Sequence, residues 1–250
     1  EIKKQTNTAL SSSKKLCEFD NIYAQLSLIR ISESISNKEK KNKLNNLLNS
    51  LKNIDISTIN ETKTSLSAFS NIPEIDFKIL ESEILEEVIK VQDTKNDVES
   101  TQTLLLDCIK IKENKNINDK EGLAAAYIKL ADTYLKLNDN KKGMEFYQKS
   151  ISLAKQIGNN YIEADARINN AYMIFEQKKY EESETEFELA NKKTFEDVAL
   201  RYKIIIGLLK LSSFIELKNK DEHINEGKKL LKNECNDLNL YNQLKELMSE

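Results

Sequence analysis

In the second half of the chain, apolar residues recur every three or four positions in stretches that polar turns separate. Such spacing places the apolar side chains on one face of a helix. In the first stretch the residues on this face are Tyr127, Leu130, Ala131 and Tyr134. The polar turn NDNKKG and a second amphipathic stretch follow, and Gly158 then suits the left-handed conformation that ends many helices. The pattern predicts a pair of antiparallel helices.

The same plan returns further along the chain. Ala171 takes the place of Ala131 in a second apolar stretch, and Ser212 has a similar place in a third, at spacings of 40 and 41 residues. A two-helix unit cannot bury its apolar face alone, so copies stack, and a small residue is needed where two helices cross closely. The recurrence predicts two stacked helix pairs and a weaker third one.

These units resemble the tetratricopeptide repeat, which has an aromatic, a Leu, a small residue and an aromatic on its first helix and an aromatic on its second. In the first unit the matching residues are Tyr127, Leu130, Ala131, Tyr134 and Tyr147. In the second they are Ala171, Tyr180, Phe187 and Ala190. Arg167 stands where the first large aromatic is expected. The 40-residue period exceeds the usual ~34 and is similar to that of long-helix variants. The resemblance implies an all-α fold, a right-handed α-α superhelix of antiparallel helix pairs.

The N-terminal part of the chain predicts further helices. Two apolar stripes are formed by Ile22, Leu26 and Ile29, and by Leu44, Leu47, Leu48 and Leu51. Pro73, the only proline, suits the first turn of a following helix, because its missing N–H is not needed there. We expect an N-terminal helical region over residues 1–70, made of degenerate or capping repeats, and a repeat domain over residues 71–250. The Ser- and Thr-rich segment 55–71 stays ambiguous between a loop and a short helix.

Composition narrows the classes of function. The net charge of −3 combines +4 in residues 1–70 with −7 in the remainder, and neither part has the clustered basic residues of a nucleic-acid-binding surface. No stretch approaches the ~20 apolar residues of a membrane span. We therefore expect neither nucleic acid nor a membrane as a partner. The three cysteines form no CxxC pair, which disfavours a cysteine zinc site and favours a reducing, cytoplasmic location. Because the chain starts at Glu1, we expect a trimmed or processed piece.

Candidate catalytic chemistry is sparse. His223 is the only histidine, and a metal site there would need Glu222 and Glu226, so an exposed position at a helix start is the simpler interpretation. No Ser or Cys nucleophile pairs with this histidine, and no Gly-rich phosphate loop is present. The acidic run from Glu181 to Glu188 is interpreted as the solvated face of a helix. We expect no catalytic, cofactor or metal site, and therefore no enzyme.

The repeat register places a set of polar side chains on the concave side of the first helices. They are Lys129, Asp132 and Lys136 in the first unit, Asn169, Tyr172 and Glu176 in the second, and Lys210 and Ser213 in the third. An Asn amide both donates and accepts, so it can bind the N–H and the C=O of an extended peptide. The resemblance implies a protein or peptide partner in this groove. The oligomeric state stays open.

Two hypotheses follow from the resemblance. In the first, the chain is a non-catalytic binding scaffold whose concave groove holds a peptide or a helix of a partner. In the second, it is the sensor region of a regulator, and occupancy of the groove alters the curvature of the superhelix and switches an output surface or domain. An enzyme with a cryptic helical active site is a third class, for which the sequence offers no residues.

Overall fold

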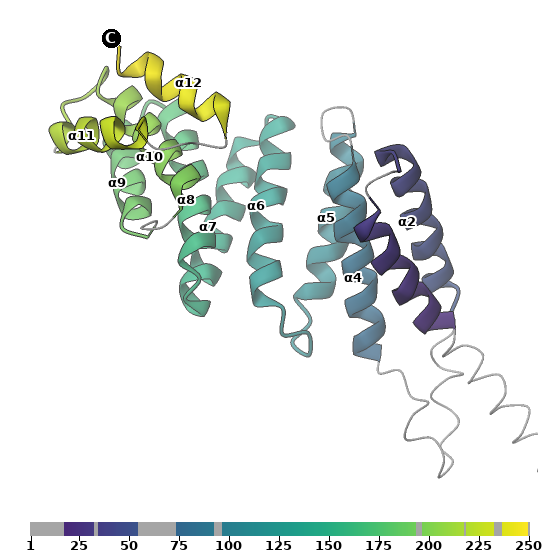
Figure 1. Cartoon of the computed structure of the whole chain (residues 1–250). Helices are drawn as coiled ribbons and strands as arrows, with labels where there is room; N and C mark the ends of the chain where they lie inside the picture. Colours follow the sequence, from purple (N-terminus) through teal and green to yellow (C-terminus); the bar gives the residue numbers. More distant parts are fainter. Residues whose placement is uncertain are drawn as a thin grey trace, which may run out of the picture. The chain divides into compact units, whose positions relative to one another are not determined.

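The structure, a computed structural model, describes residues 18–32, 35–54, 74–92, 97–193, 197–217, 219–232 and 237–249. Every regular element in these ranges is an α-helix (Figure 1). Packing divides the chain into two compact units, Glu1–Asp119 and Lys120–Glu250, and each is described by itself. The all-α fold expected from the sequence is confirmed.

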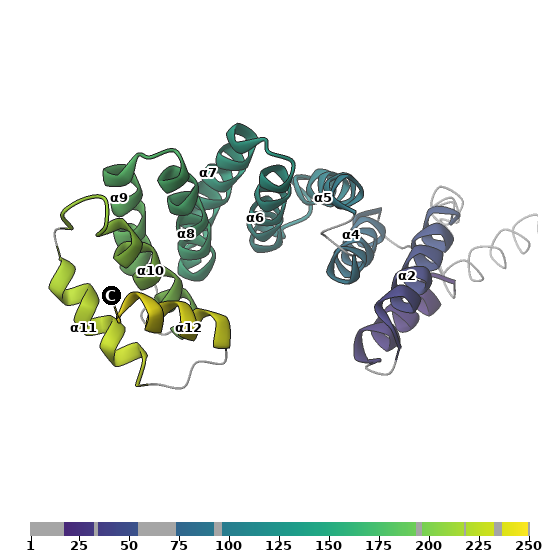
Figure 2. The same ribbon diagram turned by 90° about the horizontal axis from the view of Figure 1, so that it is seen from above.

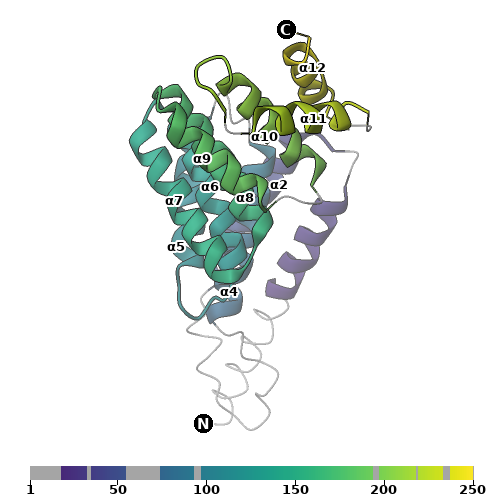
Figure 3. The same ribbon diagram turned by 90° about the vertical axis from the view of Figure 1, so that its left-hand side faces the viewer.

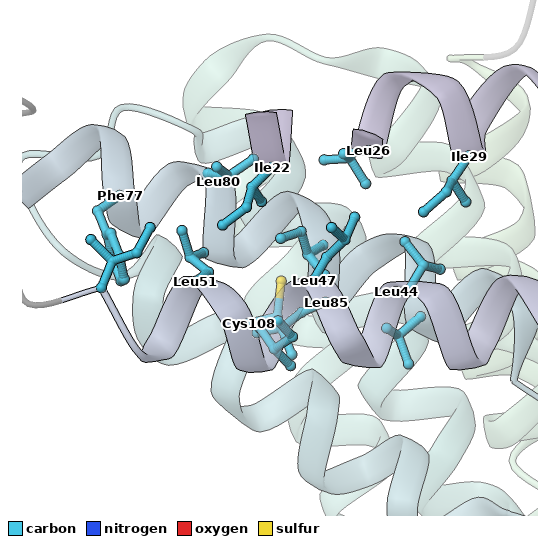
Figure 4. Packing of buried hydrophobic residues seen from close by; sticks show 14 residues of the cluster. Ile22, Leu26, Ile29, Leu44, Leu47, Leu51, Phe77, Leu80, Leu85 and Cys108 are labelled. Carbon is cyan, nitrogen blue, oxygen red and sulfur yellow. The ribbon is translucent and has the colours of Figure 1, made fainter. Parts of the chain in front are cut away.

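Unit 1 contains the helix of residues 18–31, α2 (Asn37–Lys52), α4 (Glu74–Val91) and α5 (Val98–Lys112). Ser36 begins α2, because its hydroxyl accepts a hydrogen bond from the backbone N–H of Glu39 and caps the helix. Both apolar stripes expected here are confirmed, since all of their residues are buried. They share one core with α4 and with Cys108 of α5 (Figure 4).

The packing groups the helices differently from the division expected at residue 70. α4 and α5 follow that position, yet they contact one another, and α4 shares its core with α2 in unit 1. The division into residues 1–70 and 71–250 stays a prediction of the sequence. Pro73 and the ambiguous segment 55–71 lie outside the described residues.

Unit 2 begins with two antiparallel helix pairs, α6 (Lys120–Lys136) with α7 (Asn140–Ile157) and α8 (Asn160–Glu176) with α9 (Tyr180–Asn191). α10 (Val198–Leu211) follows, and both α11 (Lys220–Leu230) and α12 (Leu238–Leu247) pack on it (Figure 3). The predicted turns are confirmed. Asp139 and Asn159 cap α7 and α8 with their side chains, and Gly158 has a φ of 71° at the end of α7.

Small residues let the two helices of each pair approach closely. Ala131 and Ala171 are fully buried. In the first pair, the Ser150 hydroxyl of α7 donates to the carbonyl oxygen of Ala124 in α6 over 2.8 Å. In the second pair, the Ser183 hydroxyl of α9 donates to the carbonyl oxygen of Ala171 in α8 over the same distance. In both pairs, a buried hydroxyl of the second helix therefore donates a hydrogen bond to the backbone of the first helix.

The third unit departs from the expected register. Ser212 is not a crossing residue inside a helix, because α10 ends at Leu211 and Ser212 is its C-cap. The close approach is made instead by Gly207, where a Cβ atom would lie 2.3 Å from the ring of Phe187. α10 also begins 38 residues after α8, whereas α8 begins 40 residues after α6. Sequence periodicity misplaced the register because almost the whole apolar run of α10 is buried, so that no single face stands out.

Candidate functional site

The first helices of the pairs, α6, α8 and α10, lie on one side of unit 2, and α7 and α9 lie on the other (Figure 2). We call the first side the A face, formed by Lys129, Asp132, Lys136, Asp165, Asn169, Tyr172, Glu176, Lys203 and Lys210. The Nζ atom of Lys203 in α10 lies 3.6 Å from a carboxylate oxygen of Asp165 in α8. Both charges also act on the carboxyl group of Asp132 in α6. Charged side chains from three helices therefore meet on this face.

Asp132 is half-buried and links the two helices of the first pair. Its carboxylate accepts a hydrogen bond from the hydroxyl of Tyr147 in α7. Burial raises the pKa of the Asp132 carboxyl above its ordinary value, and the charge of Asp165 adds to this, whereas the Tyr147 hydrogen bond and the ammonium groups of Lys136 and Lys203 oppose it. The side chain therefore serves the packing of α6 on α7 as well as the A face.

Asp132→Asn is expected to gain stability relative to the wild type as the pH rises through and above the ordinary Asp pKa of about 3.9. With rising pH the unfolded chain loses the Asp132 proton first, and the folded chain loses it later because its pKa is raised. The wild type therefore loses folding free energy over this window, whereas asparagine does not ionise and can still accept from Tyr147. Urea unfolding of both proteins at several pH values measures the difference.

Asp139→Asn is the matched control of opposite sign. The backbone N–H of Lys142 donates to the exposed Asp139 carboxylate and lowers its pKa. The wild type therefore gains stability from Asp139 as the pH rises, and the Asn variant falls behind it. Parallel stability curves for Asp132→Asn and the wild type would contradict the burial of Asp132.

Tyr172 is a packing residue of the A face. Its hydroxyl donates to the backbone carbonyl of Lys203 over 2.8 Å, and its ring meets Phe187 edge-on with centroids 5.0 Å apart. Burial raises the pKa of the Tyr172 hydroxyl well above its usual range. Tyr172 thus holds α10 against α8 and positions the backbone of Lys203.

The other expected groove residues differ in their setting. Lys129, Lys136 and Glu176 are exposed, and Lys210 is half-buried near the end of α10. Asn169 is half-buried at the middle of α8, and no side-chain hydrogen bond is formed by it within the described residues. Ser213 lies in the turn after α10, so it is exposed but not carried by a first helix.

Asp165 and Lys203 were missed by the sequence analysis. Asp165 precedes Asn169 by four residues, which is one helical turn, so the spacing alone could have placed both on one face. Lys203 could not be found in the same way, because the third unit was aligned through Ser212, which the structure places at the end of α10. Placing Lys203 on the A face required knowing the residue at which α10 begins.

The opposite side of unit 2 carries a buried ionic network. The Nε atom of Arg167 in α8 donates to Glu163 over 3.0 Å, and its terminal nitrogen donates to Glu186 of α9 over 2.6 Å. Lys193 lies 3.3 Å from the second carboxylate oxygen of Glu163. The side chains of Arg167 and Glu163 are only 6% and 4% exposed. Arg167, which stands where an aromatic residue was expected, thus links α8 to α9 through an ion pair.

The acidic run of α9 corrects an expectation. Glu181 and Glu182 are exposed as expected for a solvated face, but Glu184 is buried. Glu186 pairs with Arg167 of α8, and Glu188 lies beside His223 of α11. The interpretation as a solvated face is wrong for the second half of the run, because these carboxylates face the neighbouring helices.

His223 is buried, not exposed as expected. Its Nε2 atom lies 2.9 Å from a carboxylate oxygen of Glu188, although the two atoms are not aligned as a hydrogen bond. Arg201 of α10 pairs with Glu226 of α11 in the same cavity of about 520 Å³. The described residues contain no group of three His, Cys, Asp or Glu side chains suited to a metal ion.

The comparisons with known proteins concern the fold. No protein-family model and no curated protein matches the sequence. A signal-transduction ATPase with a tetratricopeptide-repeat sensor from Pyrococcus horikoshii is 14% identical with a TM-score of 0.58, and the match covers 98% of this chain but 38% of that protein. BtubC from P. vanneervenii is 11% identical with a TM-score of 0.56, and the match covers 99% and 92% of the two chains. A Podospora anserina protein of kinesin-light-chain type with nearly identical repeats is 11% identical with a TM-score of 0.51, covering 84% and 92%. The chain has the tetratricopeptide-repeat fold.

Within the tetratricopeptide-repeat fold, this chain replaces apolar positions of its second repeat by polar ones. Glu163 and Arg167 stand where Leu123 and Tyr127 stand in the first repeat. Asn170 stands where Leu130 does, and its buried amide has no hydrogen-bond partner within the described residues.

Among the helices that the structure describes, none is both long and apolar enough to cross a bilayer.

Proposed function

We propose that the chain is a non-catalytic scaffold that binds a protein or peptide along the A face, the concave side of its repeats. Asn169 carries the proposal. Its amide lies at the middle of α8, between the polar side chains of α6 and α10, and has no intramolecular hydrogen bond within the described residues. An amide in this state can bind both the N–H and the C=O of an extended segment.

The charges of the A face favour a partner with acidic groups. Four lysines, Lys129, Lys136, Lys203 and Lys210, lie on the face together with the three carboxyl groups of Asp132, Asp165 and Glu176. The lysines therefore outnumber the carboxyl groups on this face, and one of those carboxylates, that of Asp132, already accepts a hydrogen bond from Tyr147. The lysines would attract acidic side chains, and Asn169 would hold the backbone of the bound segment.

The first test is the effect of Asn169→Ala on affinity. A pull-down from native extract, read by mass spectrometry, identifies the partner, and titration calorimetry with the purified partner measures its binding. We expect the variant to bind roughly 5- to 150-fold more weakly, because one buried amide contact contributes about 1–3 kcal/mol. The helix content, measured by circular dichroism, should stay unchanged.

Glu182→Ala on the exposed side of α9 is the control, since exposed charges stay hydrated and screened. Tyr172→Ala is unsuitable, because Tyr172 holds the Lys203 backbone and its loss would disturb the fold. Glu184 is unsuitable too, because it is buried. If Glu181→Lys with Glu182→Lys abolished binding while Asn169→Ala left it unchanged, the partner would bind the opposite side.

A regulatory role is the second candidate function, and the bonds of Lys203 favour it. Lys203 contacts α8 in two ways. Its ammonium group pairs with Asp165, and its backbone carbonyl accepts a hydrogen bond from the hydroxyl of Tyr172. A bound acidic group that drew Lys203 away from Asp165 would change the contact between α8 and α10, and so the curvature of the repeats. A cytoplasmic location and the absence of nucleic-acid partners stay predictions of the sequence.

A further inference from the structure

An apolar groove lies in unit 1, apart from the A face. It is a cavity of about 640 Å³ between the helix of residues 18–31 and α2. Its apolar lining consists of Ile22, Leu28, Ile29, Ile35, Leu47 and Ile54. Uncharged amides and hydroxyls form most of the rest, and the charged lining residues are Glu18 and Lys43. We call this cavity the N-terminal groove.

The helix of residues 18–31 exposes one large apolar side chain at this groove and another in its last turn. Leu28, which lines the groove, is 60% exposed, and Ile31 in the next turn is 74% exposed. Unit 1 thus combines an apolar groove with exposed apolar side chains on one of the helices that form it, which is the composition of a surface that another helix covers.

The two charged residues lie at opposite ends of the groove. The short connection between the helices makes them antiparallel, and Figure 4 shows Ile29 toward Leu44 and Ile22 toward Leu51. Glu18 precedes Ile22 by one turn and therefore lies at the end where α2 finishes. Lys43 adjoins Leu44 and lies at the other end, where it also pairs with Glu39 over 3.0 Å.

This arrangement is self-complementary. A second copy that faces the groove in the antiparallel sense, related by a two-fold axis, brings Glu18 of each copy beside Lys43 of the other. The same rotation places Leu28 of each copy opposite the apolar lining of the other groove. An unrelated helix would need to supply both an apolar stripe and two opposite charges at matching ends.

We propose that the N-terminal groove binds a second copy of this chain and forms a two-fold symmetric dimer. Leu28 of each copy fills the groove of the other, and the two Glu18–Lys43 pairs set the antiparallel direction. Dimerisation through unit 1 is independent of the partner proposed for the A face in unit 2.

Sedimentation velocity of the full chain over a wide range of concentrations tests the proposal. The wild type should pass from monomer to dimer. Leu28→Glu should raise the dimer dissociation constant by about 100-fold or more, because it buries an unpaired carboxylate in each half of the interface. Leu238→Glu is the matched control: Leu238 is 69% exposed in α12, outside the groove, so this variant should dimerise like the wild type.

Charge exchange tests the direction of the dimer. Glu18→Lys and Lys43→Glu should each weaken dimerisation several-fold, and the combination of both should restore it, because the exchanged charges pair again across the interface. Circular dichroism checks that each variant is folded. A wild type that stays monomeric at every concentration, with or without a different protein bound in the groove, would overturn the proposal. So would a dimer that Leu28→Glu leaves as tight as Leu238→Glu does.

Discussion

Replacing Arg167 with methionine is expected to lower the free energy of unfolding by about 3–5 kcal/mol. Arg167 is buried between Glu163 and Glu186, at 3.0 and 2.6 Å. Removing its charge leaves the carboxylate of Glu163, which is only 4% exposed, with Lys193 as its remaining ion-pair partner at 3.3 Å. A buried charge that loses its main partner is far more costly than a neutral group. Urea unfolding followed by circular dichroism measures the loss.

The double variant Glu163→Leu with Arg167→Tyr is the matched control. It installs the residue types that the first repeat has at the equivalent positions, Leu123 and Tyr127, which are both buried there. Because both buried charges are removed together, the free energy of unfolding should stay within about 1 kcal/mol of the wild type or rise. A single variant as stable as the wild type would show that the network is hydrated rather than buried.

Gly207→Ala is expected to lower the free energy of unfolding by about 2–3 kcal/mol, although alanine favours helix by up to about 1 kcal/mol. The added methyl group would lie 2.3 to 2.8 Å from three ring atoms of Phe187. That ring is fully buried and packs edge-on against Tyr172, so it has no room to move. Thermal unfolding followed by circular dichroism would record the loss.

Gly143→Ala is the corresponding control in α7. Its added methyl group would lie 2.5 Å from Leu135, but the atom concerned is the end of a flexible, half-buried side chain. The side chain can turn away, and the gain in helix propensity offsets the cost, so we expect a change below about 1 kcal/mol. Equal losses in both variants would mean that the close approach of α10 to Phe187 is not special.

The sequence predicted the first two helix pairs because several independent signals agree there. Apolar spacing, the turn at Gly158 and the recurrence of Ala131 at Ala171 all depend on neighbours within one helix or one turn. The structure confirms each of them. In α10 these signals fail, because burial on nearly all sides removes the contrast between faces. α10 begins after Asp197, whose side chain accepts from the backbone N–H of Leu200, and its apolar residues are buried against α9, α11 and α12.

For the residues of the A face, too, local spacing predicted some features and only tertiary contacts determined the others. Periodicity placed Asn169 and Lys136 on a first helix, because the face of a helix follows from spacing alone. It could not show that Asp132 accepts from Tyr147, or that Tyr172 bonds to the backbone of Lys203, since these partners come from other helices. Whether a polar residue is available to a ligand or occupied by the fold depends on such contacts.

By itself, the sequence determined that this protein is a stack of antiparallel helix pairs, and where the first two pairs turn. Those features depend on the spacing of apolar residues and on small residues at helix crossings. Both can be identified from neighbouring positions in the sequence. Only the tertiary structure decided the partners of the charges: Arg167 with Glu163 and Glu186, and His223 beside Glu188. From the sequence alone, an isolated charged residue is predicted to be solvated. It becomes buried and paired only when helices that are distant in the chain bring the opposite charge to it.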